Sequence, residues 1–473
     1  MEQYFITLTL IFFICTIICI SVNAEDENNG YIVKVKEHSI SLMCVTDEIT
    51  YIGDNLYHAD NLNTVYSFIS EENIETIFPD YKFELFDLDY PYITSDTDFN
   101  AQWYLEKINA TSVRKSGLSG EGVKIAIIDS GINSSHPDLN QSNILQGYNC
   151  TFGAEDINDY SDNIGHGTMV AGIIAAQTDN ELDISGIASN AQIIPIKITD
   201  TNSLNISSIF LGLEKALETD CDIINMSFGG AITDEEALSI LKSYIDKAEE
   251  KGIIVVAAVG NSGHTDNVMN YPAGFDNVIG VGSVDEDLTS SYFSQKNESV
   301  FISAPGNNII SLYKNNSTTT GLGTSLSTPI VTAMIAIIKE IRPESTLQEI
   351  KELLKNTSLD CGIEGYDINY GYGVLNLERI IEEVSDDIPD FIVSQGIINS
   401  KKRIHVHNNS SKNIVANAFF ASYGDNNPLE DIKIIEDVDL IDGVTNIINE
   451  KTYENFFLWD KNLRPYTKKY SIK

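Results

Sequence analysis

The chain has 473 residues, which is enough for two or three domains. Hydrophobic residues make up 42% of it, and this fraction excludes wholesale disorder. The 69 acidic and 30 basic residues give a net charge of -39, so binding to nucleic acid is not expected, because phosphates are bound by clustered cations. Solubility is the simplest role for this acidity, and attraction of Ca²⁺ or of a basic substrate are the alternatives.

Residues 1–24 have the features of a signal peptide. The apolar run 5–20 is short for a membrane span and lies at the N-terminus. Val22-Asn23-Ala24 resembles a signal cleavage site, and an acidic, polar stretch follows it. We therefore expect an extracellular protein, free or associated with the cell surface. The first residues contain no Lys or Arg, so an uncleaved anchor is the alternative, and only then would the protein contact a membrane.

Residues 25–97 form a first small segment. Residues 31–36 alternate as a strand does, and the rest mixes short apolar runs with many acids. The segment lies between the signal peptide and the part of the chain that carries the catalytic motifs. This position predicts a removable pro-domain, and a small structural domain is the alternative.

Residues 98–384 alternate between strand-like and helix-like patterns. Five apolar runs are typical of parallel strands buried on both faces: 123–128, 193–198, 223–226, 253–258 and 278–281. Apolar residues recur at helical spacing over 206–217, and Thr233 to Glu236 has the pattern of a capping box that opens a helix ending at Gly252. The alternation predicts an α/β fold, a doubly wound parallel sheet with helices on both faces, whose site lies at the carboxyl ends of the strands.

Residues 390–473 change character again, with short β-like runs at 391–393, 404–406, 415–423 and 456–459. Turns rich in Asn and Gly separate these runs, so we expect a small all-β module. Of the cysteines outside the signal peptide and Cys44, only Cys150, Cys221 and Cys361 remain. Three cysteines neither form a complete disulfide framework nor match a metal-binding motif.

Three short segments carry residues suited to catalysis. Asp129 directly follows a buried strand, His166 stands between two glycines, and Ser325 begins an apolar helix in whose first turn Pro329 is tolerated. Each alone has a structural explanation, as a loop cap, a buried histidine or a helix cap. Together they form a known catalytic set, because a serine hydroxyl needs an imidazole base and the imidazole needs a carboxylate partner. The order Asp, His, Ser is one of the known orders of such a triad.

The segments 127–132, 163–172 and 321–330 resemble the three signature blocks of the subtilisin-like serine peptidases. The resemblance runs from about residue 98 to 383. It implies a serine endopeptidase that works through an acyl-enzyme intermediate, with Ser325 as nucleophile, His166 as base and Asp129 orienting the base. It also implies that residues 25–97 are an inhibitory and chaperone-like pro-domain, removed so that the mature chain starts between about Tyr90 and Asn100. The expected partners are a polypeptide substrate and the protein's own pro-domain, and the expected state is a monomer.

Two further blocks imply groups that bind the substrate backbone. Residues 257–263 resemble the oxyanion block of the family, which implies that the Asn261 side-chain amide and the Ser325 backbone N–H stabilise the oxyanion. Residues 225–230 resemble the strand edge that pairs with extended substrate, which implies backbone hydrogen bonds from Ser227, Phe228 and Gly229.

The primary specificity pocket is expected to be uncharged. Ser262 and Asn270 stand where the family commonly lines this pocket, and Ala258 and Gly260 leave room beneath them. We therefore expect an apolar or neutral side chain at the substrate position before the cleaved bond (P1), rather than a basic one.

A structural calcium ion is the only inorganic partner that the resemblance implies, and no cofactor is expected for catalysis. Asp138 matches a calcium ligand of the family, and the loop 177–184, with Asp179 and Asp183, matches the partner loop. The loop is one residue longer than in the family, and the family's N-terminal glutamine ligand is not evident near Phe99. Solvated surface acids are the alternative.

Other functions remain open from the sequence. The peptidase could act broadly on extracellular protein or mature one precursor peptide or spore protein. A non-catalytic, subtilisin-like binding protein and a membrane-anchored sheddase are hypotheses of other classes. The C-terminal module faintly resembles β-sandwich-like domains of secreted clostridial-type proteins, and a surface, a polymer or no ligand at all are open as its partner.

Overall fold

The computed structural model describes residues 30–36, 49–53, 55–59, 61–70, 73–79, 82–85, 101–398, 401–410, 414–423, 429–440, 443–448, 455–459 and 470–471. The predicted signal peptide and the predicted start of the mature chain lie outside these residues. The chain divides into two compact units between Lys82 and Phe83.

The first unit contains a four-stranded antiparallel sheet with the strand order β2-β3-β1-β4. Its elements are β1 (Tyr31–Val35), β2 (Ile49–Gly53), β3 (Leu56–Ala59), α2 (Leu62–Phe68) and β4 (Ile74–Pro79). A small apolar core joins helix and sheet, and it includes Val33, Ile49, Val65 and Ile69. Asn61 caps α2 by accepting a hydrogen bond from the Thr64 N–H at 3.0 Å.

The second unit is built on a seven-stranded parallel sheet, as the sequence predicts. In spatial order its strands are β14 (Ile302–Pro305), β13 (Ile279–Val284), β12 (Ile254–Ala258), β10 (Ile223–Met226), β6 (Lys124–Asp129), β8 (Gln192–Lys197) and β7 (Tyr148–Asn149). Four of the five predicted runs match these strands within about one residue, and the run 278–281 is extended to residue 284. Their residues are buried on both faces, which is why the sequence shows continuous apolar runs rather than alternation.

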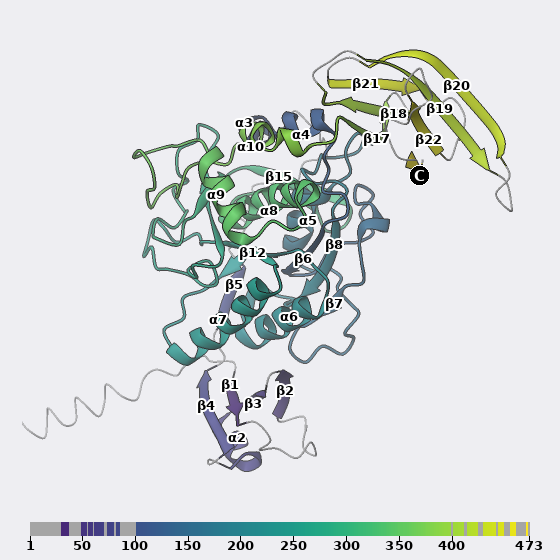
Figure 1. Cartoon of the computed structure of the whole chain (residues 1–473). Coiled ribbons are helices and arrows are strands. Elements are labelled where there is room, and N and C mark those ends of the chain that lie inside the picture. Colours follow the sequence, from purple (N-terminus) through teal and green to yellow (C-terminus); the bar gives the residue numbers. More distant parts are fainter. Residues whose placement is uncertain are drawn as a thin grey trace, which may run out of the picture. The chain divides into compact units, whose positions relative to one another are not determined.

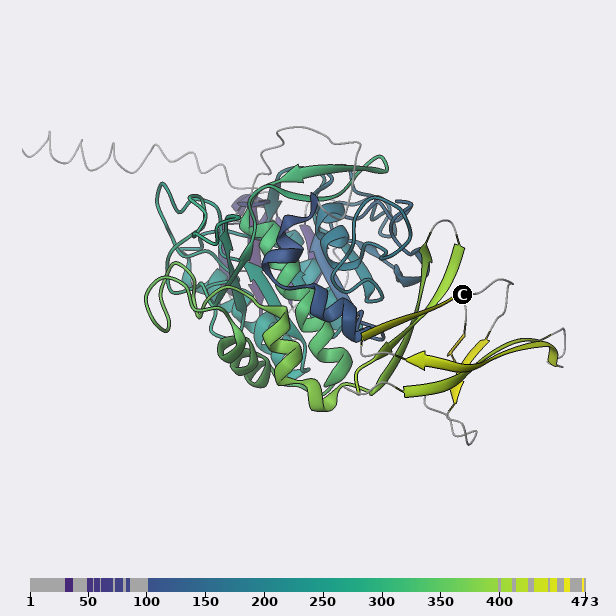
Figure 2. The ribbon, with the colours of Figure 1, turned by 90° about the horizontal axis from the view of Figure 1, so that it is seen from above.

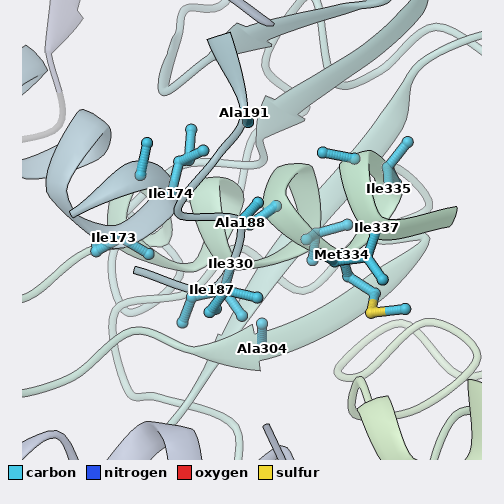
Figure 3. Packing of buried hydrophobic residues seen from close by; sticks show 14 of the residues in the cluster. Ile173, Ile174, Ile187, Ala188, Ala191, Ala304, Ile330, Met334, Ile335 and Ile337 are labelled. Carbon is cyan, nitrogen blue, oxygen red and sulfur yellow. The ribbon is translucent and has the colours of Figure 1, made fainter. Parts of the chain in front are cut away.

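Helices cover both faces of this sheet (Figure 1). On one face lie α5 (His166–Ala175) and α8 (Thr324–Ile341), and on the other lie α6 (Ile206–Glu218) and α7 (Glu235–Glu250). Figure 3 shows how tightly the first face is filled, with Ile173 and Ile174 of α5 and Ile330, Met334 and Ile337 of α8 in one apolar cluster. Packing at this density fixes where the N-termini of α5 and α8 lie.

The start of α7 differs from the predicted capping box. The N-cap is Asp234, whose carboxylate accepts from the Ala237 N–H at 2.9 Å, so Thr233 is not the cap. Asp and Thr stand side by side here, and both residue types serve as N-caps, so the pattern alone could not choose between them.

Shorter elements complete the second unit. They are α3 (Trp103–Lys107), α4 (Thr111–Ser116), β9 (Ser203–Asn205), β11 (Phe228–Gly229), the hairpin β15 (Ile309–Tyr313) and β16 (Ser317–Gly321), α9 (Leu347–Thr357) and α10 (Leu377–Glu383). The strand β5 (Lys82–Leu85) lies between β11 and β9 in a three-stranded sheet.

The described residues after 390 are almost all strands, which Figure 2 shows as long twisted ribbons. They are β17 (Phe391–Ile398), β18 (Lys401–Asn408), β19 (Ile414–Tyr423), β20 (Leu429–Leu440), β21 (Gly443–Ile448), β22 (Asn455–Trp459) and β23 (Tyr470–Ser471). Antiparallel pairing joins them into two sheets, β17-β18-β21 and β20-β19-β22-β23.

Helix α8 is long and apolar enough to span a membrane by length and composition, but most of it is buried in the core of the second unit. No other helix in the described ranges meets that criterion. Cys150, Cys221 and Cys361 are free thiols.

Candidate active site

The candidate catalytic side chains stand at the carboxyl edge of the parallel sheet and at the helix ends that face it. Asp129 is the last residue of β6, and Asn261 follows β12 by three residues. His166 is the first residue of α5, and Ser325 lies in the first turn of α8. The sequence predicts this edge as the site, because parallel strands end there together.

Asp129 and His166 are in direct contact. The His166 Nδ1 lies 2.7 Å from the Asp129 Oδ1, and both side chains are almost completely buried. Since a carboxylate only accepts hydrogen bonds, Nδ1 donates to Asp129, and in the neutral imidazole Nε2 then has the free lone pair. Gly167 permits this approach, because a Cβ at that position would lie 2.1 Å from the Gly131 carbonyl oxygen and 3.2 Å from Asp129.

Burial and two neighbouring carboxylates act on the pKa of the His166 imidazole. Burial lowers its pKa, but the charge of Asp129, the hydrogen bond to Asp129 and the charge of Asp162 raise it, and the net pKa lies above the ordinary 6.5. The imidazole of His166 is therefore a stronger base than a free histidine.

The Ser325 hydroxyl is buried at the N-terminus of α8. The N-cap of this helix is Gly323, whose φ of 145° is unfavourable for other residues. A Cβ at this position would lie 2.9 Å from the Ser325 Oγ and 3.0 Å from the Asn261 Nδ2. The glycine therefore leaves space at the point that the serine hydroxyl and the asparagine amide both face.

Thr324 fixes the orientation of the Asn261 amide. The Thr324 N–H and hydroxyl donate to the Asn261 Oδ1 at 2.9 and 3.0 Å. The oxygen is thus occupied, and the Nδ2 donor is buried without a hydrogen-bond partner among the described residues. An amide N–H aimed at the same space as a serine hydroxyl can stabilise an oxyanion that forms there.

The His166 Nε2 and the Ser325 Oγ are also buried without partners in the described part of the chain. The structure therefore brings His166 to Asp129, but it does not close a hydrogen bond between His166 and Ser325. Catalytic hydrogen bonds are often long in free enzymes and tighten when substrate binds.

The residues predicted to bind substrate lie on three neighbouring segments of the chain. β11 contains Phe228 and Gly229 and directly follows Ser227, whose hydroxyl accepts from the Asn225 amide at 3.0 Å. Gly230, which directly follows β11, exchanges two backbone hydrogen bonds with Tyr271, at 3.1 and 2.9 Å. The buried Asn270 donates from Nδ2 to the Val259 carbonyl at 2.9 Å, between Ala258 and Gly260. Segments 227–230, 258–260 and 270–271 are thus assembled side by side.

The edge of β11 is paired with another segment of the same chain. Leu85 pairs with Phe228 and Glu84 with Gly229, in antiparallel register. The sequence analysis predicted neither this pairing nor the contact of Thr324 with Asn261. Thr324 immediately precedes Ser325 in the motif, so its position was a usable signal. Nothing in the sequence of 82–85 distinguishes it from any other short strand.

The predicted calcium ligands have other partners. Asp138 is buried and accepts hydrogen bonds from the Asn180 Nδ2 at 2.6 Å and the Ile184 N–H at 3.0 Å. Burial raises the pKa of Asp138 to about 7, although both hydrogen bonds act to lower it. Asp179 forms an ion pair with Arg114 at 3.3 Å, and no group of three His, Cys, Asp or Glu side chains in the described ranges could hold a metal ion.

Both oxygens of Asp138 accept from N–H donors, those of Asn180 and Ile184. The charge of Asp183 also acts on Asp138 and raises its pKa, and calcium binding would require oxygen ligands such as these carboxylates to turn towards the ion. The Asn180 Oδ1 is engaged by the Leu182 N–H at 3.0 Å, so the amide has a defined orientation. Calcium binding stays a prediction of the sequence.

Comparison with known proteins identifies the family. Residues 120–373 match the model of the Subtilase family. The chain belongs to this family.

Individual relatives agree with this assignment. The chain is 40% identical over 283 residues to "Minor extracellular protease Epr" of Bacillus subtilis, a match that covers 60% of this chain and 42% of Epr. It is 37% identical to "Subtilisin DY" of Bacillus licheniformis over 57% of this chain and 95% of that protein. A "Thermostable alkaline protease" of Halalkalibacterium halodurans is 30% identical over 75% of this chain and 93% of its own. This subtilase is a serine-type endopeptidase, and its sheet and helices form the subtilisin-like fold that the sequence predicts.

Proposed function

We propose that this subtilase hydrolyses peptide bonds with Ser325 as nucleophile, His166 as general base and Asp129 as the partner of the base. The observation that carries the proposal is the 2.7 Å contact between Asp129 and the His166 Nδ1, which in the neutral imidazole makes Nε2 the nitrogen that can accept a proton. His166 Nε2 takes the proton of Ser325, whose oxygen attacks the carbonyl carbon of the peptide bond. The imidazolium then protonates the leaving amine, and a water molecule activated by the same Nε2 releases the acid product.

The oxyanion of the tetrahedral intermediate is assigned to the Asn261 Nδ2 and the Ser325 backbone N–H. The two bonds from Thr324 hold the amide ready before substrate arrives, so no reorganisation is needed at the moment of reaction. The location of Ser325 at a helix N-terminus favours negative charge at the same place.

We further propose that the chain is made as a pro-enzyme. The edge of β11 that would pair with extended substrate is already paired with Glu84 and Leu85. Strand addition by the chain's own segment excludes a substrate strand from the same edge. Removal of residues 25–97 would free this edge, and we expect N-terminal sequencing of the active enzyme to begin between Tyr90 and Asn100. An active enzyme that begins at residue 25 would contradict this part of the proposal.

Secretion is proposed from residues 1–24 and from the relative whose name describes it as extracellular. The polypeptide substrate is expected to carry an apolar or neutral residue at P1, because Asn270 and Ser262 are uncharged. Strict cleavage after Arg or Lys in a peptide-library assay would contradict that expectation.

The central test is labelling with a fluorophosphonate probe, which reacts with an activated serine. The wild-type enzyme should be labelled and the Ser325→Ala variant should not. Equal labelling of both proteins, or labelling of neither, would refute the catalytic assignment.

A further inference from the structure

An acidic side chain outside the triad organises the start of the helix that carries His166. Asp162 is 8% exposed, although its neighbours Ser161 and Asn163 are exposed. Its Oδ1 accepts hydrogen bonds from the N–H groups of Ile164 at 3.0 Å and Gly165 at 2.7 Å. Its Oδ2 accepts from the Thr168 N–H at 2.9 Å and the Thr168 hydroxyl at 2.6 Å.

These bonds replace a missing helix cap. The N-cap of α5 is Gly165, which has no side chain to accept from the first N–H groups of the helix. Asp162 accepts from that region instead, and its negative charge lies at the positive end of the helix. The position of the first residue, His166, therefore depends on Asp162.

The same carboxylate is also linked to the other catalytic element. The Ser130 hydroxyl donates to the Asp162 Oδ1 at 2.9 Å and accepts from the Gly167 N–H at 3.0 Å. The Ser130 N–H donates to the Asp129 Oδ1 at 2.7 Å, the oxygen that His166 also contacts. Asp162 thus connects the end of β6 with the start of α5, on either side of the hydrogen bond between Asp129 and His166.

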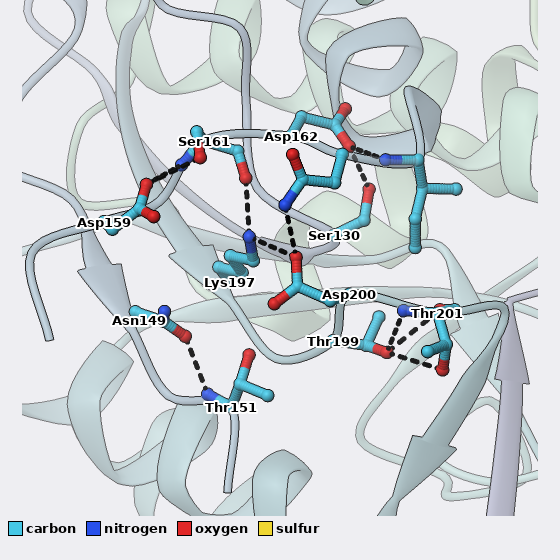
Figure 4. Close-up of polar contacts among 12 residues, drawn as sticks. Ser130, Asn149, Thr151, Asp159, Ser161, Asp162, Lys197, Thr199, Asp200 and Thr201 are labelled. Carbon is cyan, nitrogen blue, oxygen red and sulfur yellow. Dashed lines mark hydrogen bonds and ion pairs between the residues drawn. The ribbon is translucent and has the colours of Figure 1, made fainter. Parts of the chain in front are cut away.

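A buried lysine anchors the loop that presents Asp162 (Figure 4). Lys197 ends β8, pairs in register with Asp129, and has a side chain that is 1% exposed. Its ammonium group contacts the Ser161 carbonyl at 2.7 Å and Asp200 at 2.6 Å. The Asn163 amide donates to the same Asp200 oxygen at 2.7 Å. Residues on both sides of Asp162 are therefore held by one ion pair.

We propose that Asp162 is a positioning residue of the catalytic site, which holds His166 against Asp129 and stabilises the imidazolium through its charge, with the Lys197–Asp200 pair anchoring its loop. The proposal rests on the catalytic role assigned to His166 above. Burial raises the pKa of Asp162, although the hydrogen bonds from the Gly165 N–H and from the N–H and hydroxyl of Thr168 act to lower it and so favour the ionised carboxylate. The charges that face His166 are those of Asp129 on β6 and of Asp162.

The test compares Asp162→Asn with two further variants. Asp162→Asn removes the charge, and Ser130→Ala removes the hydroxyl that joins Asp162 to β6 without changing any charge. Glu155→Gln neutralises an exposed acid of the same loop as a matched control. The measurement is kcat and KM against pH on a peptide p-nitroanilide with phenylalanine at P1. Rates are corrected for the fraction of enzyme that a fluorophosphonate titrates.

We expect Asp162→Asn to lower kcat on the order of tenfold with little change in KM, and to move the acidic limb of the profile to lower pH by about 0.5 unit. Ser130→Ala should lower kcat but leave the acidic limb in place. Glu155→Gln should match the wild type both in kcat and in the position of the acidic limb.

Asp162→Asn with wild-type kcat and an unmoved acidic limb would overturn the proposal, and so would a loss of kcat without a shift of the limb, which indicates a structural role alone. If Asp162→Asn does not fold, Ser130→Ala with wild-type kcat overturns it. Failure of the proposed function is distinguishable, because the wild-type enzyme would then not be labelled by the fluorophosphonate.

Discussion

Thr324 donates two hydrogen bonds to the side-chain oxygen of Asn261, one from its backbone N–H and one from its hydroxyl. The hydroxyl in turn accepts from the Gly260 N–H at 3.1 Å, so the residue before the proposed nucleophile Ser325 is tied to the segment before Asn261. This relationship fixes which atom of the amide faces Ser325, and it makes the proposed oxyanion donor depend on two segments that lie more than 60 residues apart in sequence.

Replacement of Asn261 by alanine should lower kcat on the order of 10²–10³-fold with little change in KM, the loss known for removal of an oxyanion donor from subtilisin itself. The donor acts on charge that develops only in the transition state, so substrate binding is spared. Steady-state kinetics of the two enzymes provide the measurement. A variant whose KM rises while its kcat is unchanged would show instead that Asn261 binds substrate in the ground state.

Removal of the Thr324 hydroxyl should have a smaller effect of the same kind. Thr324→Val keeps the backbone donor to Asn261 but loses the hydroxyl donor, so the amide gains rotational freedom. We expect a fall in kcat of about tenfold. The double variant with Asn261→Ala should be no worse than Asn261→Ala alone, because the hydroxyl acts through the amide. Additive losses would refute this coupling.

The activity should rise with pH through an apparent pKa above 6.5. Burial lowers the pKa of His166, but Asp129 and Asp162 raise it to a net value above the ordinary one, and the base is active only when it is unprotonated. The acidic limb of kcat/KM in the free enzyme reports this titration. An inflection below pH 6 would mean that burial outweighs the two carboxylates.

The sequence predicted the parallel sheet, and its carboxyl edge as the site, for a physical reason. Strands buried on both faces must be continuously apolar, and their carboxyl ends must meet, so Asp129 and the segment of Asn261 could be placed on one edge. The hydrogen-bond and ion-pair partners of side chains in loops could not be predicted in this way. Within the loop 177–184, Asn180 contacts Asp138, and Asp179 forms an ion pair with Arg114. The pairing of β5 with β11 also joins segments whose local patterns carry no sign of each other.

Thermal unfolding in EDTA and in calcium tests the calcium prediction, with Ser325→Ala as the background to prevent self-digestion. If the hydrogen bonds around Asp138 close this loop, the melting temperature should be the same in both solutions to within about 2 °C. Asn180→Asp should lower it in EDTA, because two carboxylates then face each other, and calcium should restore it. Asp179→Asn is the control and should change little, because its ion pair is partly exposed. A large fall of the background protein in EDTA would establish a calcium site of the family's kind.

Glu340 near the end of α8 should make the stability depend on pH. Its Oε2 accepts from the N–H groups of Ser119 at 2.9 Å and Gly120 at 2.7 Å. Burial raises the pKa of Glu340 from 4.5 to about 7, although these hydrogen bonds act to lower it. The folded state therefore holds a proton between about pH 4.5 and 7 that the unfolded state releases, so this contribution to stability is full below pH 4.5 and is lost as the pH rises through 7.

Glu340→Gln keeps an oxygen that can accept both hydrogen bonds but does not ionise. In the Ser325→Ala background, its melting temperature relative to the parent should therefore rise as the pH increases from 5 to 8. Glu344→Gln, at an exposed position three residues past the end of α8, is the matched control and should show no such trend. A constant difference between Glu340→Gln and its parent across this range would show that Glu340 ionises at the same pH in the folded and unfolded chains.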